Sequence, residues 1–342
     1  MLSNKFSGTL CASILAMSIT MSAGACQEPA ASSGGNATPT SSAPVATAHS
    51  GGDSTAGEAA AGKAPEIDAN RALQDAKTMV DMGPRPAGSA AAKKSQQFIE
   101  SQLTSYGLKV TEDRFNGDTP HGKIPMMNII AELPGARPDI ILVTGHYDTA
   151  PLPGFVGAND GASSAASVLE MARVLAQTKP EYTLWFVFFD GEEAVIDWEA
   201  NNGMDNTYGS RHMVATLTAD GRIKQVRAML LVDMIGDKDL DIRRDSTSTP
   251  WLNELIWDTA RKMGQGRHFL GNELPMSDDH VPFKFAGVPV IDIIDFNYGP
   301  DNAYWHTKED TLDKISGESI KIVSDVVLAA LPRLYAHLDT GA

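Results

Sequence analysis

Short apolar runs of strand length recur along this chain. The run at residues 183–189 is almost entirely apolar, so a strand there would be buried on both faces of a sheet. Strands of that kind occur in parallel sheets that helices cover on both sides. Further strands are predicted at residues 128–133, 140–143, 228–232 and 288–294.

Segments with helical periodicity alternate with these runs. In residues 90–106, Phe98, Ile99 and Leu103 occur at helical spacing, and Gly107 follows as a C-terminal cap. Helices interleaved with buried strands predict an α/β fold, a three-layer α/β/α sandwich around a mostly parallel central sheet. Further helices are predicted at residues 161–177 and 316–338.

The first 26 residues have the layout of a bacterial export signal. Lys5 gives a positive start, and Ala23-Gly-Ala-Cys26 ends a short apolar stretch with small residues. This ending resembles a lipobox, which would make Cys26 the lipidated first residue. Ordinary signal-peptide cleavage is the alternative, as is an inert apolar role for the cysteine. Residues 27–66, rich in Ala, Ser, Gly and Pro, predict a disordered tether before a catalytic domain at 67–342.

The charge of the chain excludes some partners. A net charge of -15 and a pI near 4.9 oppose binding to phosphate backbones and anionic lipids. We therefore expect no nucleic-acid partner, and membrane contact only through a lipid at Cys26. The signal predicts a periplasmic or cell-envelope location, or secretion if no lipid is added. Because Cys11 would leave with the signal, we expect no internal disulfide. We also expect the protein to be a monomer.

Polar residues gather just beyond the ends of the predicted strands, where open α/β sheets bind ligands. The adjacent carboxylates Glu192 and Glu193 follow the strand at 183–189, and past a strand end the backbone can turn both toward one site. One could hold a metal ion while the other moves protons. Together the polar residues form the donor set of a zinc site without cysteine, catalytic if one coordination position is open. The other members are His146, Asp148, Asp160, Asp233 and His306.

Each of these residues also has a structural explanation. Asp160 precedes a predicted helix and could be its N-cap. Glu192 and Glu193 could form an exposed turn, and His146 or His306 could be a hydrogen-bonded surface histidine. The joint placement favours a site, because independent surface residues would not all follow strand ends.

Five motifs carry these residues in order: Thr144-Gly-His146-Tyr-Asp148, Gly157-Ala-Asn-Asp160-Gly-Ala, Phe189-Asp-Gly-Glu192-Glu193, Leu231-Val-Asp233-Met-Ile-Gly236 and Trp305-His306-Thr. The series, spread over about residues 73–338, resembles the zinc peptidases of family M28. Three further features resemble the type II glutaminyl-peptide cyclotransferases within that superfamily. These are Trp198 after the glutamate pair, the doubled aspartate Asp278-Asp279, and Trp305 directly before His306.

For the metal, the resemblance implies that Asp160, Glu193 and His306 hold one zinc ion. The reaction it implies converts an N-terminal glutamine of a peptide or protein to pyroglutamate and releases ammonia. The alternative is a zinc aminopeptidase that hydrolyses the first peptide bond. In that case His146 and Asp233 would bind a second zinc, and Asp160 would bridge the two ions.

For catalysis, the resemblance implies that Glu192 is the general acid and base, supported by Asp233 and Asp278. Asp279 and Asp148 are assigned as second-metal ligands or as hydrogen-bond partners behind the site. A third possibility is a tethered binding protein that kept the fold and lost catalysis, and it ranks last because no member of the set is missing. The predicted pocket walls for the glutamine side chain are Trp198 and Trp305.

Overall fold

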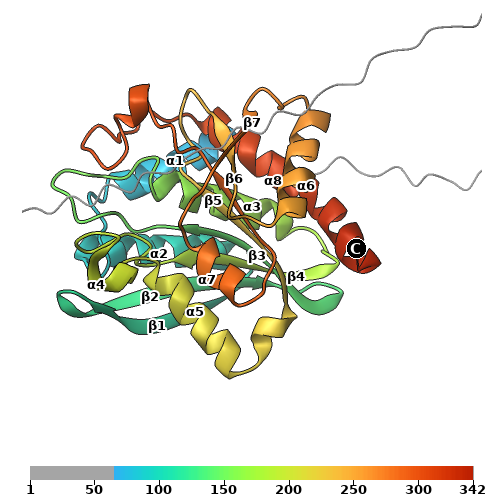
Figure 1. The fold of residues 1–342 in the computed structure, drawn as a ribbon, viewed down its shortest axis with the longest axis horizontal. Helices are drawn as coiled ribbons and strands as arrows, with labels where there is room; N and C mark the ends of the chain where they lie inside the picture. Colours follow the sequence, from blue (N-terminus) through green and yellow to red (C-terminus); the bar gives the residue numbers. More distant parts are fainter. Residues whose placement is uncertain (1–64, 342) are drawn as a thin grey trace, which may run out of the picture. The chain divides into compact units, whose positions relative to one another are not determined.

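A computed structural model describes residues 65–341 as an eight-stranded sheet with helices on both faces (Figure 1). The predicted signal peptide, Cys26 and nearly all of the predicted tether lie outside these residues. Between residues 65 and 341, no helix is long and apolar enough to cross a membrane. The strands are β1 (Lys109–Thr119), β2 (Gly122–Leu133), β3 (Arg137–His146), β4 (Tyr182–Phe189), β5 (Val226–Asp233), β6 (Ile242–Asp245), β7 (Phe269–Leu274) and β8 (Val290–Ile294). The helices are α1 (Ala69–Val80), α2 (Ala90–Ser105), α3 (Ala162–Leu175), α4 (Ala200–Gly203), α5 (Tyr208–Ala219), α6 (Pro250–Lys262), α7 (His280–Phe285) and α8 (Gly317–Thr340), with 3-10 turns η1 (Arg222–Gln225) and η2 (Pro300–Asn302).

The strand order of the sheet is β1-β2-β4-β3-β5-β8-β6-β7. The central strands β4, β3, β5 and β8 are parallel, as is the β6–β7 pair, whereas β1–β2, β2–β4 and β6–β8 are antiparallel. Every residue of β4 is buried, as expected for a strand covered on both faces. The predicted α/β sandwich with a mostly parallel sheet is confirmed.

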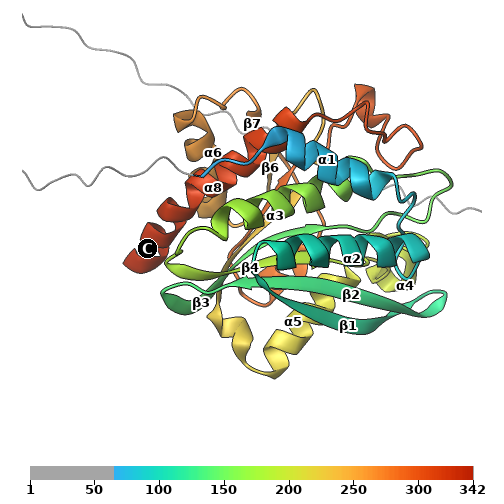
Figure 2. The ribbon, with the colours of Figure 1, turned by 180° about the vertical axis from the view of Figure 1, so that it is seen from behind.

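Two layers of helices cover the sheet. Helices α1, α2, α3, α6 and α8 lie on one face, and α5 and α7 lie on the other (Figure 2). Successive strand residues alternate between the two layers. Val143 of β3 packs into the larger core, and its neighbour Leu142 packs into a smaller core with Met213 of α5 and Phe283 of α7.

The sheet places the candidate residues at one edge. From β3 the chain crosses through α3 to β4 on one side, and it then returns through α5 to β5 on the other side of β3. The strand order therefore reverses at β3, and such a switch point opens a crevice beyond the carboxyl ends of the strands. His146, Phe189 and Asp233 are the last residues of β3, β4 and β5.

Candidate active site

Asp160 reaches the site from the turn before α3. The N-cap of this helix is Gly161, with φ 91°, and no side chain caps the helix, so the interpretation of Asp160 as an N-cap is wrong. A side chain at Gly161 would place its Cβ 2.5 Å from the carbonyl oxygen of Asp148. Glycine lets the chain turn here, and the Asp160 carboxylate is left to point away from the helix.

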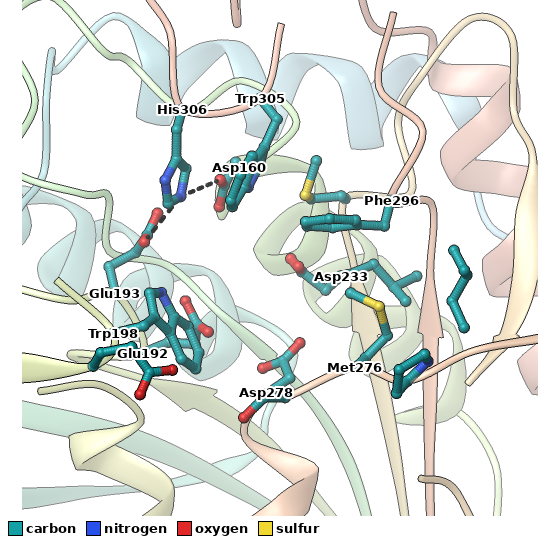
Figure 3. Close-up of a pocket in the computed structure, with 16 residues that line it drawn as sticks. Asp160, Glu192, Glu193, Trp198, Asp233, Met276, Asp278, Phe296, Trp305 and His306 are labelled. Atoms are coloured by element: carbon teal, nitrogen blue, oxygen red, sulfur yellow. Dashed lines mark ion pairs between the residues drawn. The ribbon is translucent and has the colours of Figure 1, made fainter. Parts of the chain in front are cut away.

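Asp160, Glu193 and His306 form the first group of possible metal ligands (Figure 3). His306 Nε2 lies 3.2 Å from Glu193 Oε2 and 3.4 Å from Asp160 Oδ2. Glu193 Oε1 is buried without a hydrogen-bond partner among the described residues. Two carboxylates and one imidazole with an unused oxygen suit a divalent metal ion that binds nitrogen and oxygen.

His146, Asp160 and Asp233 form a second group that shares Asp160 with the first. His146 Nε2 lies 3.0 Å from Asp233 Oδ1 and 3.3 Å from Asp160 Oδ1. Ser164 of α3 donates a hydrogen bond of 2.9 Å to the same oxygen of Asp233. The predicted residues of both metal arrangements are thus brought together around one shared carboxylate.

Asp148 connects the second group to the glutamate pair. One of its oxygens lies 3.5 Å from His146 Nδ1. Its two oxygens accept the backbone N–H groups of Glu192 (3.2 Å) and Glu193 (3.3 Å). This carboxylate therefore lies beside an imidazole and fixes the turn that carries both glutamates.

Glu192 and Asp278 hold protons more tightly than ordinary carboxyls. Burial raises the pKa of Glu192 well above its usual range, and the charge of Asp278 raises it further. Burial, followed by the charge of Asp233, raises the pKa of Asp278 to about 7. Crowded buried carboxyls avoid carrying full charge together, so this pair retains a proton more readily than isolated carboxyls do.

The electrostatics of the group Asp160, Glu193 and His306 differ from those of Glu192 and Asp278. Burial and the charge of Asp160 raise the pKa of Glu193 to about 7. Burial lowers the pKa of His306, but hydrogen bonds to Asp160 and Glu193 outweigh burial and raise it to about 10. Burial raises the pKa of Asp160, yet hydrogen bonds from His146 and His306 hold it below its usual range. The group thus favours a positive charge between its carboxylates, which a metal cation would also supply.

A cavity of about 440 Å³ lies beside these residues. Trp198 and Trp305 line it, together with Glu192, Asp233 and Asp278. His146, Asp148 and Asp279 are buried behind its wall. The predicted tryptophans and proton-handling carboxyls therefore share one cavity with Asp160, Glu193 and His306.

The sequence analysis missed several residues that shape the site. Phe296 meets Trp305 edge-on at 4.9 Å between ring centroids, and Trp305 stacks on His306 at 4.1 Å. Buried Asp310 accepts the backbone N–H groups of Asn159 (2.8 Å) and Asp160 (3.1 Å) and so anchors the turn before α3. Asp310 lies four residues after His306, and this closeness in sequence was the available signal for it.

The fold and the site together define an α/β protein with metal-type ligands at the switch point of its sheet. The sequence model of peptidase family M28 matches residues 128–331, and the chain belongs to this family.

The proteins and structures that resemble this chain carry more specific names within the family. A glutaminyl-peptide cyclotransferase-like protein of Mus musculus is 30% identical over 279 residues, which cover 72% of this chain and 71% of that protein. The crystal structure of an Acidobacteriales bacterium glutaminyl cyclase is 38% identical, covers 82% of this chain and all of that one, and has a TM-score of 0.77. A structure described as a leucine aminopeptidase precursor from Bacteroides thetaiotaomicron is 27% identical, covers 78% and 98% of the two chains, and has a TM-score of 0.71.

Proposed function

We propose that this protein is a zinc-dependent glutaminyl-peptide cyclotransferase, which converts an N-terminal glutamine to pyroglutamate and releases ammonia. One observation carries the proposal: the buried carboxyl Glu192 shares a tryptophan-walled cavity with three metal-type ligands. The relatives that are named glutaminyl cyclases or cyclotransferases support the same reaction. The substrates would be peptides or proteins that begin with glutamine.

The metal proposal assigns one zinc ion to Asp160, Glu193 and His306. Their nitrogen and oxygen donors and the unpartnered Glu193 Oε1 fit such an ion. When bound, zinc would polarise the γ-carbonyl of the glutamine and stabilise the negative charge that develops on its oxygen.

Glu192 would carry the proton. It takes a proton from the substrate α-amine, which then attacks the γ-carbonyl carbon of the same residue. The new C–N bond closes the ring, and Glu192 returns the proton to the amide nitrogen as its bond to the γ-carbon breaks, so that this nitrogen leaves as ammonia. A carboxyl with a raised pKa suits both transfers, and the neighbouring Asp278 supplies part of that rise. Asp233, which raises the pKa of Asp278, completes the network.

The cavity wall would fold the substrate. Nucleophile and electrophile belong to one residue, so the protein mainly has to bend the glutamine side chain back on itself. Flat apolar walls such as Trp198 and Trp305 restrict the side chain to compact shapes without competing for its hydrogen bonds.

Zinc aminopeptidase activity is the second candidate. The observation in its favour is the group of His146, Asp160 and Asp233, which would hold a second ion beside the first. Glu192 would then activate water for hydrolysis of the peptide bond. The similar structure described as a leucine aminopeptidase precursor agrees with this alternative.

We further propose that the protein is exported from a bacterial cell and anchored by a lipid on Cys26 in the cell envelope. Support for this comes from the first 26 residues and the composition of residues 27–66. Metabolic labelling with a fatty acid would test it, because a Cys26→Ser variant should lose the label.

One assay separates the two enzymatic candidates. The purified, zinc-loaded protein receives a Gln-initiated and a Leu-initiated peptide, and ammonia and free amino acids are both measured. Ammonia release from an otherwise intact Gln peptide supports the cyclotransferase. Release of free leucine with no ammonia would replace it with the aminopeptidase. Loss of either activity with a chelator, and recovery with zinc, would exclude a binding protein without catalysis.

A further inference from the structure

The cavity carries an excess of acidic side chains. Within the described part of the chain, its only basic side chain is His306, and no lysine or arginine lines it. The negative charges of most of these acids are already balanced, because the acids pair with His306 or His146 or share protons with each other. The six acids are Asp160, Glu192, Glu193, Glu199, Asp233 and Asp278.

Glu199 differs from the other five. They are all buried, whereas Glu199 is exposed to solvent while it still lines the cavity. Its backbone N–H donates to Asp197 Oδ1 at 2.8 Å, but within residues 65–341 no hydrogen-bond donor or cation contacts its carboxylate. An unpaired carboxylate is therefore available at the open side of the cavity.

The loop that carries Glu199 is fixed in place by a buried carboxylate. Asp205 is fully buried and accepts the backbone N–H groups of Val195 (3.2 Å), Ile196 (2.7 Å) and Asp197 (3.2 Å). The hydroxyl of Tyr208 donates a fourth hydrogen bond of 2.6 Å to it. Charge-assisted hydrogen bonds of this kind hold a loop firmly.

The far end of the same loop is tied to the catalytic turn. The backbone N–H of Thr207 donates to the carbonyl of Glu192 at 2.8 Å, and Asn206 Nδ2 donates to the carbonyl of Trp198 at 3.1 Å. Trp198 and Glu199 are consecutive, so the wall that would hold the glutamine side chain continues into the exposed carboxylate. A peptide seated against Trp198 must leave the cavity by its open, solvent-exposed side.

We propose that Glu199 selects peptides with a cationic side chain directly after the N-terminal residue. The inference rests on the proposed function, because it takes the N-terminal side chain to occupy the cavity. An arginine or lysine in the second position would then meet an unpaired carboxylate, whereas an acidic residue would meet repulsion from Glu199 and from the acidic cavity behind it. An exposed pair of this kind changes an equilibrium by roughly two- to fivefold and weakens with salt.

Three peptides that differ only at the second residue, Gln-Arg, Gln-Ala and Gln-Glu, would test the proposal on the zinc-loaded full chain. The wild type is expected to show the lowest KM for the Arg peptide and the highest for the Glu peptide, with the spread reduced at high salt. Glu199→Gln should bring the three KM values together. Glu254→Gln removes an exposed charge from α6, outside the cavity, and should keep the wild-type order. A Glu199→Gln enzyme that keeps the full order would overturn the proposal.

Measuring peptide binding to a variant that does not turn over tests the role of Glu199 separately from the proposed reaction. Calorimetry measures the affinity of the same peptides for a Glu192→Gln variant and for a Glu192→Gln/Glu199→Gln double variant. The Arg peptide should bind the single variant roughly two- to fivefold more tightly than the Ala peptide, and the double variant without preference. A preference without ammonia release by the wild type would reject the cyclotransferase and keep the role of Glu199. Equal affinities for the single variant would reject the role itself.

Discussion

Among the described residues, two of the three groups that combine one histidine with two carboxylates lie in different surroundings. The cavity cluster is Asp160, Glu193 and His306, and the buried cluster is Asp245, His280 and Asp292. In the cavity cluster, the His306 side chain is 24% exposed and Glu193 Oε1 has no donor among the described residues. In the buried cluster all three side chains are excluded from solvent.

Hydrogen bonds occupy the central carboxylate of the buried cluster. Asp245 accepts the backbone N–H groups of Thr247 (2.8 Å) and Met276 (3.0 Å), together with the hydroxyls of Thr247 and Ser248 (both 2.7 Å). Burial and the nearby Asp278 raise the pKa of Asp292 well above its usual range. Residue types alone therefore do not define a metal site. Access distinguishes the cavity cluster, which borders the cavity through the partly exposed His306, from the buried one.

His306→Ala is expected to have the largest effect, because it removes one of three ligands from the cavity cluster. Zinc affinity should fall more than about 100-fold, beyond the loss expected for a residue that only supports a ligand, and turnover should fall with it. Chelator competition measures the affinity. His212→Ala is the matched control, since His212 pairs with Asp113 and stacks on Phe115, outside the cavity. Unchanged zinc affinity in His306→Ala would remove this histidine from the site.

Glu192→Gln should lower kcat by about 10²–10⁴-fold and leave zinc bound, because it removes a proton carrier and no proposed ligand. Glu193→Gln, the adjacent and matched substitution, should instead lose zinc. Metal analysis and ammonia release on both variants measure the two effects. Equal zinc loss from the two variants would contradict the division of roles between neighbouring carboxylates.

The sequence predicted the sheet where burial leaves a simple pattern. β4 is apolar throughout because it is covered on both faces, and its apolar run was predicted directly. β1 is an edge strand with mostly polar and largely exposed residues, and β6 has only four residues, so neither produces a periodic signal. Among the described strands, β1 pairs only with the adjacent β2, whereas β6 pairs with β7 and β8, which lie much further along the chain.

The candidate site could be predicted in part for a similar reason. Glu192 and Asp233 lie at or just after strand ends, where the fold class itself indicates a crevice. Phe296 and Asp310 lie in irregular segments, and only the tertiary structure brings them to Trp305 and to the turn at Asp160. The sequence also contained the His280 cluster, and only the structure shows that it does not line the cavity that Asp160, Glu193 and His306 border.

His280→Ala tests the buried cluster. His280 Nε2 lies 3.2 Å from Asp245 Oδ2, with both side chains fully buried, so its removal takes an imidazole partner away from the buried Asp245 carboxylate. The free energy of unfolding should fall by about 3–5 kcal/mol, measured by urea unfolding. The zinc bound per folded chain should stay at the wild-type value. Loss of one zinc ion per chain would show that the buried cluster binds metal and would end the contrast between the clusters.

Asp245→Asn should have the smallest effect, and one that depends on pH. Burial raises the pKa of Asp245, but hydrogen bonds from His280, Ser248 and Thr247 outweigh burial and hold it well below the unfolded value near 4. A depressed pKa in the folded state stabilises the fold above the unfolded pKa, and this contribution is lost as pH falls toward the folded pKa. At pH 7 the variant should therefore be less stable than the wild type by about 2 kcal/mol, and the difference should shrink steadily below pH 4.

Salt separates this buried effect from a surface one. The pKa of Asp258, a half-buried surface residue, is also lowered, to about 2, first by Lys262 and then by Arg333. Asp258→Asn should likewise lose its effect in acid, but added salt should remove that effect at pH 7 because water and ions screen an ion pair at the surface. The Asp245 difference should survive the same salt, since its partners are buried around it. Urea unfolding at pH 7 and pH 3, with and without salt, measures the stability difference between the wild type and each variant. A salt-sensitive Asp245 effect would mean that the buried cluster opens to solvent and resembles the cavity cluster in access.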